Sequence, residues 1–384
     1  MSAKNSLHFV LTRSAAVVLI LLVFEAAFRF GFWEPFAKPE SSAGRTIAVK
    51  RSVNTLGPEK IDFITMGDSR ALYGIDHERV NALAKSTGFT HANVATPSMH
   101  WMSTELLFRW LKARAPNLKG VMIATNVTSF SYNGNGDYEL AIATPLATIH
   151  DLNWMALHVP FDRSKLATYG SYSALFQYRA DIADFLHNPV ARIKSVARER
   201  VSPTQDARLF ESQKVLSNIC STPTASLKAC SAATASATNA GVVASCKSLA
   251  AEADNRPDFR DFNNADKWPH LAVVKKIRQS QLRALGLSRP ALVVLMPVPK
   301  VWRDEVLPKG GEAWAHSILQ PLVDEGVIEL VDYTHLFDSP NGAECNAFWD
   351  LYHQNAGGQQ RLTDALLPVI DKYLYKSSEP VNKP

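Results

Sequence analysis

Short apolar runs alternate with amphipathic stretches along most of the chain. This pattern predicts strands alternating with helices. Five runs predict buried strands, at about 60–66, 91–95, 118–125, 290–296 and 327–333. Apolar residues at helical spacing predict helices at about 76–85, 102–113, 269–285 and 358–375. We therefore expect an α/β fold with a doubly wound, mostly parallel, five-stranded sheet.

Three polar residues directly follow the first three predicted strands. They are Ser69, Ser98 and Asn126, and the loop before the final helix adds Asp350 and His353. In open parallel sheets, ligands bind beyond the carboxyl ends of the strands. All five residues therefore map to the edge where a site is expected.

The N-terminus has a different pattern. Residues 14–24 carry no charge, Lys4 and Arg13 precede them, and apolar character continues to Trp33. Two interpretations compete, a cleaved signal peptide and a spanning anchor over residues 7–33. The absence of a small-x-small cleavage motif before a polar mature start favours the anchor. Basic residues before the apolar run predict a cytoplasmic N-terminus and an extracytoplasmic body. Glu25 would then be costly in lipid unless it faces a partner or the interface.

The anchor sets the domain boundaries. We assign residues 1–33 to the cytoplasmic N-terminus and anchor, 34–58 to a proline-containing linker, and 59–376 to one domain. Residues 200–262, rich in Ser, Ala and Thr, are expected as a helical insertion, and 377–384 as a tail. The basic residues at 188–200 indicate either a solvated helix face or a docking face for anionic lipid headgroups or glycan.

Composition narrows the function class. The chain has 384 residues, 46% hydrophobic and 20% charged, which is typical of a folded protein. Its formal charge of +5 gives no argument for nucleic acid. The four cysteines, Cys220, Cys230, Cys246 and Cys345, suit disulfides in an oxidising compartment, with three connectivities open. Their spacing does not match a zinc site, and no cofactor is indicated.

Ser69 is the candidate nucleophile. Gly67-Asp68-Ser69 follows the first strand, and Asp350-x-x-His353 precedes the final helix. A serine hydroxyl needs a base within hydrogen-bond reach, and the base needs an orienting group. His353 would take the proton of Ser69, and Asp350 would hold the imidazole.

The developing oxyanion needs preorganised donors. The backbone N–H of Ser69 is one candidate, and the side-chain amide of Asn126 is a second. A backbone N–H or hydroxyl between Thr96 and Ser98 is a third.

These residues resemble the SGNH (GDSL-type) hydrolase superfamily over about residues 60–375. The resemblance implies a flavodoxin-like sheet and a Ser-His-Asp triad. It also implies oxyanion donors at the serine backbone, at a glycine in the second sequence block and at an asparagine in the third. The second block of this chain, residues 93–98, has no glycine, and the third lacks the usual Gly-x-Asn-Asp form.

With its N-terminal anchor and its Gly-Asp-Ser-Arg sequence, the chain is similar to the membrane-anchored SGNH proteins of alginate O-acetylation and teichoic-acid D-alanylation. This resemblance implies a multi-pass membrane-bound O-acyltransferase as partner. It also implies transfer of an acyl group, acetyl or D-alanyl, to a cell-envelope polysaccharide or related polymer. Two alternatives remain open: a periplasmic carbohydrate esterase with the same triad, and a non-catalytic anchored assembly subunit.

Overall fold

A computed structural model describes most of the chain. It covers residues 3–38, 40–130, 136–158, 172–201, 269–305, 309–338, 347–349 and 353–375, together with 232, 243–244, 246–247, 250–251 and 307. Asp350, most of the expected insertion and the tail therefore lie outside the described residues.

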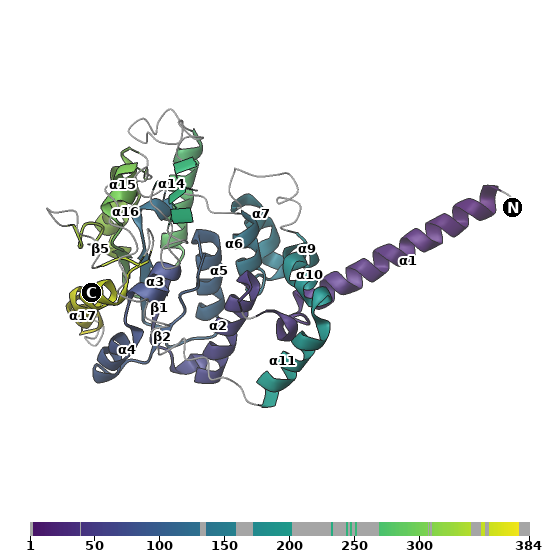
Figure 1. The fold of residues 1–384 in the computed structure, drawn as a ribbon, viewed down its shortest axis with the longest axis horizontal. Coiled ribbons are helices and arrows are strands. Elements are labelled where there is room, and N and C mark those ends of the chain that lie inside the picture. Colours follow the sequence, from purple (N-terminus) through teal and green to yellow (C-terminus); the bar gives the residue numbers. More distant parts are fainter. Residues whose placement is uncertain are drawn as a thin grey trace. The chain divides into compact units, whose positions relative to one another are not determined.

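A five-stranded parallel sheet forms the centre of the fold (Figure 1). Its strands are β1 Phe63–Gly67, β2 His91–Asn93, β3 Gly120–Thr125, β4 Ala291–Leu295 and β5 Ile328–Asp332, in the order β2-β1-β3-β4-β5. All four neighbouring pairs are parallel. The sequence prediction of an α/β fold with a five-stranded sheet is confirmed, and this strand order is the flavodoxin-like one.

Three helices cover one face of the sheet. They are α3 Ser69–Gly74, α4 His77–Ser86 and α17 Ala356–Tyr375. Leu72, Val80 and Leu366 from these helices pack with strand residues such as Phe63 and Leu292 in one buried cluster. Because side chains alternate along a strand, the neighbouring residues point to the opposite face.

That opposite face is also buried, since Ile64, Val121 and Val293 are fully covered. Three helices lie there, α5 Trp101–Lys112, α14 Pro269–Arg283 and α16 Gly311–Asp324, and α14 contacts both of the others. Helices on both faces explain why the strands read as continuous apolar runs rather than as alternating ones.

The chain divides into two compact units. Unit 1 comprises residues 1–48 and 135–205, and unit 2 comprises 49–134 and 206–384. Unit 2 holds the whole sheet. Among its described residues, unit 2 also contains η2 Pro58–Lys60, η3 Val127–Phe130 and α15 Lys300–Glu305.

Unit 1 is helical. Its elements are α1 Ala3–Arg29, η1 Glu34–Phe36, α6 Gly136–Ala143, η4 Ile149–Asp151, α7 Leu152–His158, α9 Ala174–Gln177, α10 Arg179–His187 and α11 Pro189–Val201. Phe28, Trp33, Ile47, Ala174 and Tyr178 form its buried cluster. Residues 135–205, which the sequence pattern assigns to the sheet domain, fall in one unit with the N-terminal segment.

The expected linker differs from the structure. Residues 34–58 contain helix α2, Ser42–Leu56, in which Ile47 and Val53 are buried. The prolines at positions 35, 39 and 58 indicate breaks, and they do mark its flanks, but the apolar residues between them pack as a helix.

The N-terminal apolar segment forms the continuous helix α1. The expected spanning anchor over residues 7–33 is not found, because no helix in the part of the chain that the structure describes combines the length and the apolar character needed to cross a membrane. Glu25 in this helix accepts hydrogen bonds from Ser173 Oγ at 2.9 Å and from the backbone N–H of Ala174 at 2.7 Å. Glu25 therefore caps the start of α9, and its partners are protein groups of unit 1.

One cysteine lies among the described residues. Cys246 is fully buried and disulfide-bonded. The other three cysteines lie outside the described residues.

Candidate active site

Ser69 and His353 meet in the folded chain. His353 Nε2 lies 2.9 Å from Ser69 Oγ, although the two residues are 284 positions apart. This distance is a hydrogen bond between a hydroxyl and an imidazole, the arrangement that a serine nucleophile and its base require. If the imidazole accepts the hydroxyl proton, its own proton is on Nδ1.

The turn between β1 and α3 presents Ser69. Strand β1 ends at Gly67, and Asp68 caps α3 by accepting the backbone N–H of Arg70 at 2.8 Å. Ser69 is the first residue of that helix, so its N–H belongs to the group that finds no partner within the helix. The turn thus places both the hydroxyl and the backbone N–H of Ser69 at the carboxyl end of β1.

Gly67 makes this turn possible. A Cβ atom at this position would lie 2.2 Å from the carbonyl oxygen of Ala124 and 2.6 Å from Ala71 Cβ. Both atoms belong to elements that pack directly on the turn, β3 and α3. Only glycine therefore allows the strand, the helix and the neighbouring strand to approach this closely.

The loop before α17 holds His353. Phe348 and Gln354 form an antiparallel bridge, and the N–H of Trp349 donates to the carbonyl of His353 at 2.9 Å. The buried Gln354 donates through Nε2 to the carbonyl of Pro297 at 3.3 Å, just beyond β4. The backbone of His353 is therefore tied to the sheet edge.

The candidate oxyanion donors flank the nucleophile. Ser98 follows β2 and Asn126 follows β3, and these strands lie on either side of β1. Asn126 is fully buried, and its Nδ2 donates to Ser129 Oγ at 3.0 Å. Parallel strands bring these positions to the same edge as Ser69, as the sequence predicted.

Ser98 has the conformation of a glycine. Its φ angle of 62° lies in the left-handed region that side chains disfavour. Residues 93–98 contain no glycine, but the backbone at Ser98 takes a conformation that glycine adopts readily. Strain of this kind occurs mostly where a loop is held for a purpose, such as a binding site.

A residue that the sequence did not single out stands beside the nucleophile. Arg70 is buried, lies 3.7 Å from Asp68 through its guanidinium, and faces the Trp302 ring at 5.5 Å. The next residue, Arg303, begins a second polar cluster. Helix α15 therefore connects the nucleophile turn with the loops beyond β4 and β5.

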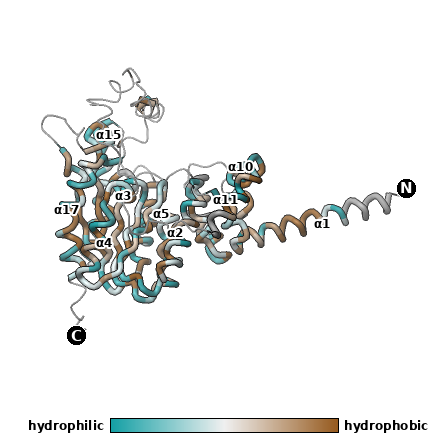
Figure 2. Tube along the Cα trace, turned by 60° about the horizontal axis from the view of Figure 1, so that its bottom comes forward, coloured by the Kyte–Doolittle hydropathy of each residue, from teal (hydrophilic) through white to brown (hydrophobic). Residues whose placement is uncertain are grey.

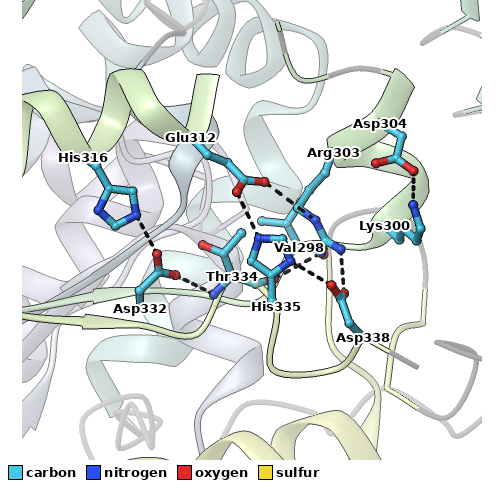
Figure 3. Close-up of polar contacts among 10 residues, drawn as sticks. All are labelled: Val298, Lys300, Arg303, Asp304, Glu312, His316, Asp332, Thr334, His335 and Asp338. Carbon is cyan, nitrogen blue, oxygen red and sulfur yellow. Dashed lines mark hydrogen bonds and ion pairs between the residues drawn. The ribbon is translucent and has the colours of Figure 1, made fainter. Parts of the chain in front are cut away.

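Figure 3 shows this second cluster. The buried Arg303 donates to the carbonyl oxygens of Val298 and Thr334 and binds Asp338 at 2.5 Å. His335 lies between Asp338 and Glu312, at 2.7 and 2.9 Å. Burial opposes protonation of His335, but its hydrogen bonds to the two carboxylates outweigh it and raise its pKa. The cluster braces the loops beyond β4 and β5.

A small cavity lies at the same sheet edge. Its volume of about 20 Å³ is room for about one water molecule. The ends of β1 and β3 and the start of α5 line it, with residues that include Gly67, Asp68, Met99, Trp101 and Thr125. The cavity adjoins the turn that presents Ser69, because Gly67 and Asp68 of that turn line it.

Two histidines are buried between α4 and the sheet. His77 and His91 stack with ring centroids 6.0 Å apart and an interplanar angle of 11°. His91 Nε2 lies 2.9 Å from Thr65 Oγ1, and His77 Nε2 lies 2.9 Å from the carbonyl of Ala71 in α3. Burial lowers the pKa of His77 to about 4 and that of His91 well below its usual value.

The predicted site residues differ in how far the structure describes them. Of the predicted residues, Ser69 and His353 are in contact, Ser98 and Asn126 follow the flanking strands, and Asp350 lies outside the described residues. Among the residues that the structure describes, no group of three or more His, Cys, Asp or Glu side chains could hold a metal ion.

Comparison with known proteins adds no assignment. The chain matches none of the protein families and none of the curated proteins with which it was compared.

Proposed function

We propose that this chain is a membrane-attached, extracytoplasmic serine acyltransferase. It transfers a small acyl group, through an acyl-Ser69 intermediate, to a hydroxyl of a cell-envelope polymer. The observation that carries the proposal is the 2.9 Å contact between Ser69 Oγ and His353 Nε2 at the carboxyl edge of a parallel sheet. The resemblance to anchored SGNH proteins supports the polymer acceptor and a multi-pass O-acyltransferase as the donor's source.

The first half-reaction forms the acyl-enzyme. Ser69 Oγ attacks the carbonyl carbon of the donor while His353 Nε2 takes the hydroxyl proton. The carbonyl oxygen becomes an oxyanion, which the N–H of Ser69, the turn at Ser98 and the amide of Asn126 would stabilise. The intermediate collapses, the leaving group receives the proton from His353, and the acyl group remains on Ser69.

The second half-reaction transfers the acyl group from Ser69 to the acceptor. A polymer hydroxyl gives its proton to His353 and attacks the acyl carbon, which restores the Ser69 hydroxyl. Asp350, in the loop before His353, would orient the imidazole and stabilise its charged form. Water in place of the polymer hydroxyl would make the same site an esterase, so acceptor binding and exclusion of water decide between the two.

The disulfide of Cys246 supports the location outside the cytoplasm. Structural disulfides persist in oxidising compartments and are rare in the cytosol. A site facing outward would also meet the polymer that the resemblance implies.

A fluorophosphonate probe tests the chemistry at Ser69. We expect a covalent adduct on Ser69 in the native protein, located by mass spectrometry of peptides, and none in Ser69→Ala. Ser86→Ala is the matched control, because it removes an exposed serine at the end of α4 and should leave labelling intact. A folded protein without an adduct would instead support the non-catalytic assembly role.

Products then separate transfer from hydrolysis. With an activated acetyl ester and an acidic polysaccharide as acceptor, we expect O-acetyl groups on the polymer. Acetate released at the same rate with and without the polymer would identify an esterase.

A further inference from the structure

Exposed large apolar side chains gather in unit 1. Among the described residues, this set comprises residues 17–24, Phe30, Phe32, Ile149, Tyr172, Leu186, Val190 and Ile193, whereas unit 2 contributes Val273 and Tyr375. The exposed fraction reaches 90% for Phe30 and 71% for Leu186. A concentration of this kind marks a surface that is covered by something else, because single exposed apolar residues are otherwise scattered.

Ring contacts link one member of this set, Phe32, to helix α10. Phe32 lies 6.0 Å from Phe36, and Phe36 lies 5.9 Å from Phe185, measured between ring centroids. The next residue after Phe185 is Leu186, in the last turn of α10. We call Phe30, Phe32, Leu186, Val190 and Ile193 the apolar patch. It joins the C-terminal end of α1 to α10 and α11, which contacts η1.

Val190 and Ile193 extend the patch along α11. They are three residues apart, so they share one face of the helix, and both are exposed. Arg192, between them, points the other way. It is buried and binds Asp184 at 2.5 Å, so the basic segment around 188–200 is not simply a solvated helix face.

The polar groups behind the patch are paired within the unit. Trp33 Nε1 donates to Asp181 at 2.5 Å, and the backbone N–H of Lys38 donates to the same carboxylate at 2.8 Å. Glu25 binds Arg29 at 2.5 Å while it caps α9. Charges that are satisfied internally cost less in a medium of low dielectric constant than charges that need water.

Helix α1 identifies the occupant. Its residues 17–24 are apolar and exposed on every side, and Figure 2 shows this part of α1 as hydrophobic. A helix that is apolar all round is surrounded by protein or by lipid, and no described residue covers this one. Two exposed aromatic side chains follow, Phe30 and Phe32, and apolar rings of this kind lie at the boundary between headgroups and acyl chains in membrane-surface helices.

We propose that unit 1 is a membrane-interface element whose apolar patch lies in the headgroup–acyl boundary of the bilayer, beside the C-terminal end of α1. This inference rests on the membrane attachment in the proposed function and goes beyond it. The bilayer would be held not by one helix alone but also by α10 and α11. The exposed Lys194 on α11 can reach headgroup phosphates, as lysines do at interfaces.

Photo-crosslinking of the full chain tests this contact. Benzoylphenylalanine replaces Leu186, and the protein is reconstituted in vesicles of phosphatidylethanolamine and phosphatidylglycerol. Ile20 in α1 is the positive position. Ser195, exposed on a different side of α11, and Tyr375, 67% exposed in unit 2, are the matched controls. After irradiation, mass spectrometry identifies whether each position carries lipid or protein.

We expect lipid adducts at positions 20 and 186 and no lipid adducts at positions 195 and 375. An adduct at 20 without one at 186 would overturn the inference and leave the anchor in place. Lipid at neither position would overturn both the inference and the membrane attachment, while the phosphonate probe reports on Ser69 separately. A protein–protein crosslink at 186 would assign the patch to a second copy and overturn the lipid contact. Equal adducts at 186 and 195 would also overturn it.

Discussion

The ring of Tyr73 meets the imidazole of His353 edge-on, with centroids 5.8 Å apart and an interplanar angle of 74°. Tyr73 lies four residues after Ser69 on α3, so one short helix carries the nucleophile and a side chain that positions its base. Four residues are about one helical turn, which places both side chains on the same face. Helix α3 therefore fixes the base relative to the nucleophile.

Tyr73→Ala should lower kcat by about two- to tenfold, since an edge-to-face aromatic contact is worth about 0.5–1.5 kcal/mol. KM should change little, because the contact is with the base and not with the substrate. Tyr73→Phe keeps the ring and should keep most of the activity. Hydrolysis of an activated acetyl ester measures both variants, and unchanged turnover in Tyr73→Ala would remove this role.

Ser69 and His353 should act as one unit. Ser69→Ala and His353→Ala should each lower activity by about 10³-fold or more, and the double variant should lose no more than either. Asp350→Asn should also reduce activity strongly by weakening the orientation of the imidazole. Single-turnover rates measure this, with the melting temperature as a control for folding. Multiplicative losses in the double variant would mean that the two side chains act independently.

The strands were predictable because each is a short apolar run with clear limits. The run at 290–296 became β4 Ala291–Leu295, and the run at 327–333 became β5. Helix α3 was not predicted, because its six residues are too few to show a helical period. Proline positions suggested a linker at 34–58, and the buried Ile47 and Val53 of α2 override that signal.

The parts of the site were visible in the sequence, but their contacts were not. Ser69, Ser98 and Asn126 could be placed at one edge, since parallel strands end together. The meeting of Ser69 and His353 depends on the loop at 347–354, and no spacing reports a contact across 284 positions. Arg70 entered only as part of the Gly-Asp-Ser-Arg sequence, and its contact with Trp302 gave no signal, because a cation over a ring arises only when α15 packs on α3.

Gly67→Ala should destabilise the protein by about 3 kcal/mol, because the new methyl group meets the Ala124 carbonyl and the backbone must shift. Activity should fall as well, since Ser69 moves with the turn. Gly326→Ala is the control, because Gly326 also has a positive φ of 70° but a Cβ there meets nothing within 4 Å. It should cost only about 1–2 kcal/mol for the left-handed conformation. Urea unfolding of both variants gives the comparison, and equal losses would contradict the close approach at Gly67.

Ser98→Gly should stabilise the protein by about 1 kcal/mol, because glycine takes the left-handed conformation without strain. It should also retain activity if the backbone N–H, and not the hydroxyl, serves the oxyanion. Ser98→Val should lose stability, since a branched side chain is poorly tolerated at this φ angle. Urea unfolding and ester hydrolysis on the same samples separate the two effects. Lost activity in a stabilised Ser98→Gly protein would identify the hydroxyl as the donor.

The stacked pair of His77 and His91 should make the protein sensitive to acid. Burial lowers the pKa of His77 from 6.5 to about 4, so the unfolded chain binds more protons than the folded one between these values. Stability from the neutral imidazole is therefore full above about pH 6.5 and is lost as the pH falls towards 4, by about 1.4 kcal/mol per pH unit for each proton. His91, whose pKa burial also lowers, extends the loss in the same direction.

We expect the free energy of unfolding in urea to fall steeply between pH 6.5 and 4, as these pKa values require. His91→Phe should flatten that slope by one proton, while His187→Gln, at an exposed histidine, is the control for removing an imidazole. An unchanged slope in His91→Phe would show that carboxylates, and not the buried imidazoles, carry the acid sensitivity.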